Sequence, residues 1–231
     1  MRSKKKILLS LASLLVITNN SLFAVDNEEG GYVGQAGQGH DTVVYNFLKH
    51  FNYEQYYWGY QSEWTTQNNT YVDAMDFAIF AGHGNQWLIA LLDGNVNLAS
   101  AGNSSHGGYG DTDLEFVAFE SCSVVPSPLE VSDWWTNWVG TNGIFDGLHQ
   151  ALGFRTNSYQ STDEKITDYF GAKVSSGNKV WQSWFEAINA KGLSSEYGSA
   201  VMHPTTQNDT YASFVADPPA NHTNLTIWYQ H

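Results

Sequence analysis

Two short apolar runs, at residues 74–81 and 116–119, are the clearest indication of the fold class of this chain. Both are dominated by Phe, Ala, Ile and Val, without the alternation of polar side chains that marks a strand with one face in water. A strand buried on both faces of a parallel sheet has this composition. We therefore expect an α/β fold with a mostly parallel central sheet.

The residues that follow these two runs suit catalysis. Gly82-His83-Gly84 comes after the first run, and Glu120-Ser121-Cys122 follows the second with the only cysteine of the chain. Loops at the carboxyl ends of parallel strands form the crevice in which α/β proteins bind ligands, so His83 and Cys122 would lie side by side. An imidazole beside a thiol increases the thiolate fraction and can protonate a leaving group. We predict that Cys122 is a nucleophile, that His83 is its general acid and base, and that the N–H groups of Gly84 and Cys122 bind an oxyanion.

Other interpretations compete with that prediction. Cys122 could be a buried structural thiol, which is a common core residue. His106 and His149 are the other histidines that could pair with it. A metal site of His83, His106, Cys122 and a carboxylate is disfavoured because neither H-E-x-x-H nor C-x-x-C spacing is present. The serines beside Cys122 lack the G-x-S-x-G turn of a serine hydrolase. We expect no metal and no cofactor.

The pattern resembles the clan CD cysteine peptidases, the group of caspase, legumain, gingipain and clostripain. In that group a hydrophobic strand ends in His-Gly and a later one ends in a small residue and Cys; here His83 and Cys122 are 39 residues apart. The run Glu120-Ser121-Cys122-Ser123 is similar to the Glu-Ala-Cys-Glu-Ser of legumain-type members, although no glycine follows the cysteine. The resemblance covers residues 40–203. It implies a three-layer α/β/α sandwich that cleaves peptide bonds in a peptide or protein substrate.

Four residues are candidates for substrate contact. In the resembled family, the loop after the strand expected at residues 153–157 borders the specificity pocket, which makes Arg155 and Tyr159 candidates. Glu120 and Trp87 are the other two. For Arg155 the competing interpretation is an ordinary surface arginine. The residue preferred at the cleavage site and the oligomeric state are left open.

The first 24 residues have the pattern of a secretory signal peptide. Arg2 and the lysines at positions 4–6 precede an apolar stretch at 7–17. This stretch is too short to span a bilayer. With cleavage after Ala24, we expect an exported protein, periplasmic or extracellular, without stable membrane insertion. Residues 25–40, rich in Gly and acidic side chains, would form a flexible arm, and residues 41–231 a single domain.

Charge and aromatic content limit the partners. Removing residues 1–24 takes four of the 10 basic residues and none of the 23 acidic ones, which leaves a formal net charge of −17. A chain with this negative charge binds the phosphate backbone of a nucleic acid poorly, because the charges repel each other. It favours basic partners. The 9 Trp and 13 Tyr residues support an alternative function, an exported domain that binds peptide or glycan without turnover.

Local patterns predict the remaining elements. The helix at residues 144–152 would bring His149 inward. The expected elements are helices at 42–52, 144–152, 164–175 and 178–191, a short helix at 134–138, strands at 86–92, 153–157 and 198–203, a surface loop at 94–110, and an irregular hairpin after Pro204.

Overall fold

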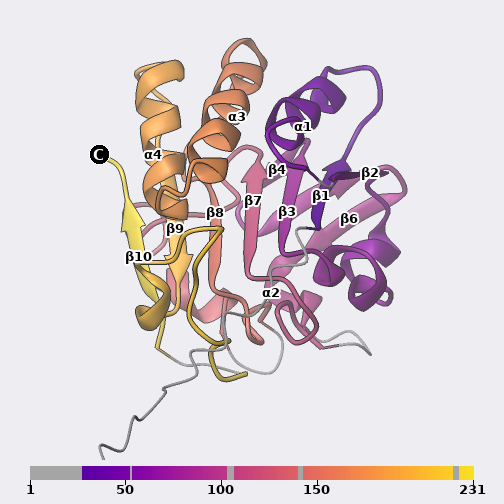
Figure 1. The fold of residues 1–231 in the computed structure, drawn as a ribbon, viewed down its shortest axis with the longest axis vertical. Helices are drawn as coiled ribbons and strands as arrows, with labels where there is room; N and C mark the ends of the chain where they lie inside the picture. Colours follow the sequence, from indigo (N-terminus) through magenta and orange to yellow (C-terminus); the bar gives the residue numbers. More distant parts are fainter. Residues whose placement is uncertain (1–27, 53, 103–106, 140–142, 221–223) are drawn as a thin grey trace, which may run out of the picture.

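The centre of the protein is a mostly parallel sheet, which has seven strands in the part of the chain that the structure describes (Figure 1). The computed structural model describes residues 28–52, 54–102, 107–139, 143–220 and 224–231. The strands of the sheet are β1 (Glu29–Val33), β2 (Glu54–Trp58), β3 (Phe77–Ala81), β7 (Phe116–Glu120), β8 (Gln150–Phe154), β9 (Gly198–Met202) and β10 (Thr226–Tyr229). Their spatial order is β10-β9-β8-β7-β3-β1-β2. The first five in chain order run parallel, whereas β9 is antiparallel to both of its neighbours. The mixed α/β fold with a mostly parallel sheet is thus confirmed.

Alternate residues of the central strands face two separate cores. Phe77 and Ile79 of β3 belong to one hydrophobic cluster, and Ala78 and Phe80 belong to the other. Because successive side chains of a strand point to opposite faces, this division shows a sheet that is covered on both sides. The uninterrupted apolar runs follow from this double burial.

Three helices cover one face of the sheet (Figure 1). They are α1 (His40–Leu48), α3 (Gln160–Ser175) and α4 (Val180–Lys191). Ile166, Phe170 and Val174 are buried along one side of α3, at the four-residue spacing that places side chains on a single helix face. Phe170 packs against Phe47 of α1 and Trp184 of α4, so the three helices share one core with the sheet.

Short elements cover the opposite face. Its core includes Trp64, whose ring contacts Phe80, Tyr109 and Phe119. Within the described residues, no long helix lies on this face. The elements are the 3₁₀ helices η1 (Gln61–Trp64), η2 (Asn68–Thr70), η3 (Val72–Ala74) and η4 (Trp134–Asn137), the helix α2 (Leu98–Ala101), and the antiparallel strands β4 (Gly84–Asn85), β5 (Leu88–Leu91) and β6 (Gly94–Asn97). A further 3₁₀ helix, η5 (Pro204–Thr206), follows β9.

The expectation of a flexible arm at residues 25–40 is wrong for the described part of that segment. β1 lies in the middle of the sheet between β2 and β3, and all five of its residues are buried. Its glycines are required by packing, because a Cβ at Gly31 would lie 2.1 Å from Cγ1 of Val44. A glycine usually indicates a loop, but Gly31 here lets α1 approach the sheet. Residues 25–27 lie outside the described residues, as does the expected signal peptide.

The helix expected at residues 144–152 is also wrong. The chain there forms a turn that leads into β8, which begins earlier than the strand expected at 153–157. Gly147 has a φ of 118° and packs on Gly110, whose carbonyl oxygen would lie 2.0 Å from an added Cβ. A helix would require a negative φ at this position. The loop expected at 94–110 is likewise wrong in part, since β6 and α2 begin it.

The other expected helices are confirmed with shifted ends. They correspond to α1, α3 and α4, while the short tryptophan-rich helix is the 3₁₀ helix η4. None of the described helices is long and apolar enough to cross a membrane.

Candidate active site

The register of the sheet places His83 and Cys122 at the same edge. β3 and β7 are parallel neighbours, with Phe77 opposite Phe116 and Ala81 opposite Glu120. In each pair, the two residues are as far apart in sequence as His83 and Cys122 are. Both site residues therefore leave the sheet at the same level, two residues beyond the last pair of the ladder.

The two loops that carry these residues are packed against each other. A Cβ added to Gly84 would lie 2.4 Å from Oγ of Ser121 and 2.7 Å from Cγ2 of Val124, so only glycine fits beside the cysteine loop. The backbone N–H of Trp87 donates a hydrogen bond to the carbonyl of Val124, at 3.3 Å. The carbonyl of His83 accepts a hydrogen bond from Ala90, at 2.8 Å. The His83 loop is thus held between the Cys122 loop and β5.

The loop after β1 completes the site from the other side of β3. The strand order β2-β1-β3 makes the gap between β1 and β3 a topological switch point, where ligands of open α/β sheets bind. Oε1 of Gln38 in this loop lies 2.9 Å from Nε2 of His83, and the amide nitrogen of Gln38 donates to Oε1 of Gln35 at 2.7 Å. Because the Gln38 oxygen can only accept, Nε2 of His83 carries the proton. Nδ1 is then the basic nitrogen of the ring.

A second histidine, His40, packs edge-on against His83. The ring centroids are 5.6 Å apart and the rings are nearly perpendicular. His40 begins α1 after Gly39, whose φ is 80°, and only 7% of His40 is exposed. Burial, and next the charge of His83, lower the pKa of His40 below its ordinary value. His40 is therefore a neutral, close neighbour of His83 at neutral pH. The sequence interpretation, which placed it at the end of a flexible arm, missed this contact.

Cys122 is half-buried and its thiol rests against the loop that precedes α3. Its Sγ lies 3.6 Å from the carbonyl oxygen and 3.8 Å from Oγ of Ser158. Among the described contacts, no hydrogen bond joins Cys122 to His83. The next residue, Ser123, has a φ of 56° and donates its N–H to the carbonyl of Thr156, at 2.8 Å. This left-handed conformation favours glycine and is rare for other residues, so the backbone directly after the thiol is held in a strained turn.

A group of buried carboxyl side chains lies between Cys122 and the start of α3. Glu120, the last residue of β7, is 2% exposed. Burial raises its pKa well above the ordinary range, and the neighbouring Asp163 and Glu196 raise it further. Burial also raises the pKa of Asp163, to about 6. Glu196 accepts hydrogen bonds from the N–H of Tyr159 and from the Thr162 hydroxyl, both at 2.9 Å. The buried position of Glu120 thus favours its protonated, uncharged form.

The candidate substrate-contact residues occupy different environments. Tyr159 is 41% exposed and directly follows Ser158, which puts it near the thiol. Trp87 is half-buried with a φ of 58°, in the turn beside the Cys122 loop. Glu120 is buried as described above. Arg155 is tied into the structure, since its guanidinium pairs with Glu130 and donates to the carbonyl of Gln230 at 2.8 Å.

His149 is not a partner of Cys122, which corrects that alternative. It directly precedes β8, at the amino edge of the sheet, whereas Cys122 follows the carboxyl end of the parallel β7. His149 is fully buried, with Nδ1 2.8 Å from Asp209 and Nε2 3.6 Å from Asp217. It fixes the C-terminal segment to the sheet. His106 lies outside the described residues, and within them no group of His, Cys, Asp or Glu is arranged to hold a metal.

Comparison with known families identifies the chain. The sequence model of a domain of unknown function, DUF6345, matches residues 12–230. The chain belongs to the DUF6345 family. No curated protein matches it significantly. In this DUF6345 member the match runs through every strand and helix described above, so His40, His83 and Cys122 all lie inside the family domain.

Proposed function

We propose that this protein is a secreted cysteine peptidase with a caspase-like α/β/α architecture. The observation that carries the proposal is the common register of His83 and Cys122 on adjacent parallel strands, with the loops that hold them packed together at Gly84. A thiol beside an imidazole at the carboxyl edge of an α/β sheet is the arrangement that nucleophilic catalysis requires.

The reaction begins with transfer of the Cys122 thiol proton to Nδ1 of His83. Gln38 supports this step because its contact with Nε2 leaves Nδ1 as the acceptor. Sγ then attacks the scissile carbonyl, and the N–H groups of Gly84 and Cys122 bind the oxyanion that develops. His83 returns the proton to the leaving amine as the peptide bond breaks and a thioester remains. Water, deprotonated by His83, hydrolyses the thioester and restores the thiol.

The thiol must move before the first step. Its contacts in the structure are to Ser158, so the first step requires a rotation about the Cα–Cβ bond of Cys122 that directs Sγ to His83. Catalytic hydrogen bonds are often long without substrate and tighten in the complex. Tyr159, beside Ser158 and 41% exposed, contacts the bound peptide in this proposal. The acidic chain favours peptides with basic residues.

Incubation of the mature chain, residues 25–231, with a mixture of proteome-derived peptides tests the proposal by mass spectrometry. We expect cleavage after one class of residue, none with Cys122→Ala, and kcat/KM lowered by about 10²–10⁴-fold in His83→Asn. Equal cleavage by Cys122→Ala and the unchanged chain would identify a contaminating peptidase. Absence of any cleavage by a folded chain would refute peptide hydrolysis.

The alternative, an exported domain that binds without turnover, is favoured by one observation. The edge strand β2 exposes the rings of Tyr56 and Trp58. A binding domain would keep its affinity in Cys122→Ala and would not react with thiol-directed inhibitors at that residue.

A further inference from the structure

Aromatic rings gather on the protein surface where α1 meets the edge strand β2. Tyr45 of α1 is 53% exposed, and Tyr56 and Trp58 of β2 are 42% and 41% exposed. The rings of Tyr56 and Trp58 lie edge to face, with centroids 6.5 Å apart. Large exposed aromatic side chains close together on a soluble domain commonly mark a binding surface.

A hollow of about 280 Å³ lies between these elements, lined by Asp41, Thr42, Tyr45 and Tyr56. Burial, and next the charge of Asp41, raise the pKa of the Tyr56 hydroxyl to about 12. Among the described residues, Asp41 forms no ion pair. The hollow therefore combines two aromatic rings with a carboxylate that has no cation of its own.

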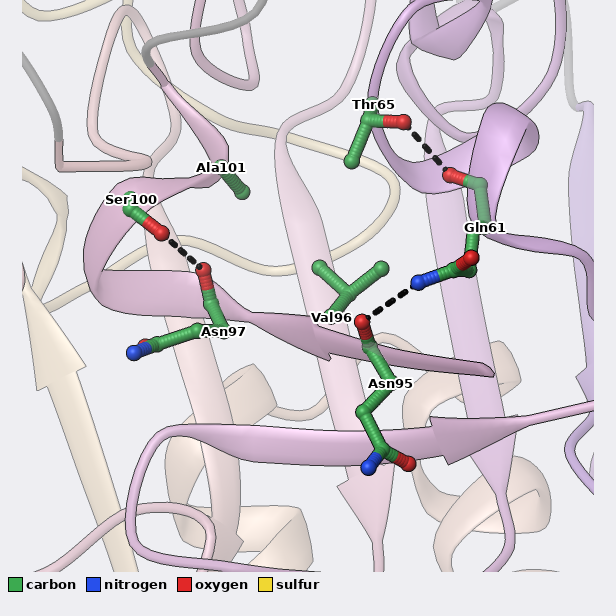
Figure 2. A pocket seen from close by; sticks show the side chains of 7 residues that line it. All are labelled: Gln61, Thr65, Asn95, Val96, Asn97, Ser100 and Ala101. Atoms are coloured by element: carbon green, nitrogen blue, oxygen red, sulfur yellow. Dashed lines mark hydrogen bonds between the residues drawn. The ribbon is translucent and has the colours of Figure 1, made fainter. Parts of the chain in front are cut away.

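A second hollow of the protein differs from it in chemistry (Figure 2). It has a volume of about 380 Å³ and is lined by neutral side chains of η1, of Thr65 directly after it, and of β6 and α2. Several of their polar groups are bonded within the wall: Gln61 donates to the carbonyl of Asn95 at 2.7 Å, and Ser100 donates to the carbonyl of Asn97 at 3.2 Å. Its lining contains no charged side chain and no aromatic ring. It therefore has no feature that would select a charged or an aromatic ligand.

We propose that the hollow between α1 and β2 binds a cationic group, namely a lysine or arginine side chain of a protein partner. A cation over the face of an aromatic ring is attracted by the ring quadrupole, and the Asp41 carboxylate adds a direct charge interaction. The excess of 23 acidic over 10 basic residues draws cations toward the surface as a whole. This site does not depend on the proposed peptidase activity.

Nuclear magnetic resonance titration of the mature chain tests the site directly. The probes are Nα-acetyl-lysine methylamide and its neutral analogue Nα-acetyl-norleucine methylamide. We expect the lysine probe to shift the amide signals of residues 41–45 and 56–58 in a saturable way, and the norleucine probe to leave them unchanged. Asp41→Asn should weaken lysine binding about threefold to fivefold, and Tyr56→Leu about twofold to fivefold.

Asp133→Asn is the matched control, because it removes one exposed carboxylate elsewhere on the surface and should leave the affinity unchanged. Cys122→Ala should also bind the lysine probe normally, which separates this site from the peptidase. Equal binding of norleucine, or no saturable shift by lysine, would overturn the proposal. Binding of a neutral oligosaccharide such as cellohexaose at the same residues, unaffected by Asp41→Asn, would overturn it in favour of a glycan platform.

Discussion

At the scale of single residues, the contact between Gln38 and His83 decides which ring nitrogen can act as the base in the proposed mechanism. Nε2 of His83 lies against the Gln38 oxygen, and Gln38 is itself held by Gln35. A hydrogen bond to one ring nitrogen fixes the tautomer and the orientation of a histidine whose other nitrogen takes part in catalysis. Gln38 is thus a positioning residue in the proposed mechanism, acting through His83.

Replacing Gln38 by leucine should lower kcat about tenfold with little change in KM, because the imidazole loses the hydrogen bond that orients it. Gln38→Glu should move the acid limb of the pH–rate profile to higher pH, because a carboxylate favours the imidazolium form. Steady-state kinetics from pH 5 to 9 measure both effects. Gln182→Leu, at an exposed position of α4, is the control. An unchanged kcat and pH profile in both Gln38 variants would remove Gln38 from the mechanism.

At the scale of elements, the site depends on how closely α1 packs on β1. His40 begins α1 and the Gln38 loop joins the two elements. Gly31 in β1 lies directly under the helix, where an added Cβ would be 2.1 Å from Val44 and 2.7 Å from Leu48. The position of His40 beside His83 therefore rests on a glycine in the middle of a strand.

We expect Gly31→Ala to lower the free energy of unfolding by about 2–3 kcal/mol, because α1 must move away from the sheet. Urea unfolding followed by circular dichroism measures the loss. Gly37→Asn serves as the comparison, since no atom lies within 4 Å of its added Cβ and Asn tolerates the positive φ of that position. Equal stability of Gly31→Ala and the unchanged chain would contradict this account of the packing.

The sequence predicts the buried strands better than the elements around them. β3 and β7 could be predicted because a strand buried on both faces is an uninterrupted apolar run that is followed by polar residues. His83 and Cys122 could be found because they lie in the polar residues directly after these strands. β1 could not, because Gly31 serves a contact with α1 and Gly30 a contact with Met75, and both partners are distant in sequence. Gln38 and His40 were missed for the same reason. Their roles depend on the neighbour that the fold brings to them.

At the scale of the whole molecule, several buried carboxyl groups couple folding to pH. Burial is the main cause that raises the pKa of Glu29 to about 7, of Asp73 to about 8 and of Glu115 to about 9. These groups keep their protons in the folded protein when the unfolded chain has already lost them. As pH rises above about 4.5, the unfolded state is therefore favoured more and more, until the folded pKa of each group is passed. The lowered pKa of His40 acts in the opposite direction, but only as pH falls below about 6.5.

The protein should therefore be more stable at pH 5 than at pH 8.5, with a melting temperature higher by about 5–10 °C. Glu115→Gln should raise the free energy of unfolding by about 1–2 kcal/mol at pH 8.5 and change it little at pH 5. Thermal unfolding across this pH range provides the measurement. Glu164→Gln, at an exposed position of α3, should have almost no effect at either pH. A melting temperature that rises toward pH 8.5 would contradict the buried-acid account.

Covalent labelling tests whether Cys122 and His83 form a catalytic pair, as the proposed function requires. The folded mature chain is exposed to a panel of peptidyl acyloxymethyl ketones that differ in their terminal residue, and the adduct is located by mass spectrometry. We expect one adduct, on Cys122, formed with one class of peptide and much more slowly in His83→Asn. Labelling only after unfolding, with iodoacetamide and with none of the peptidyl probes, would show that Cys122 is a structural thiol.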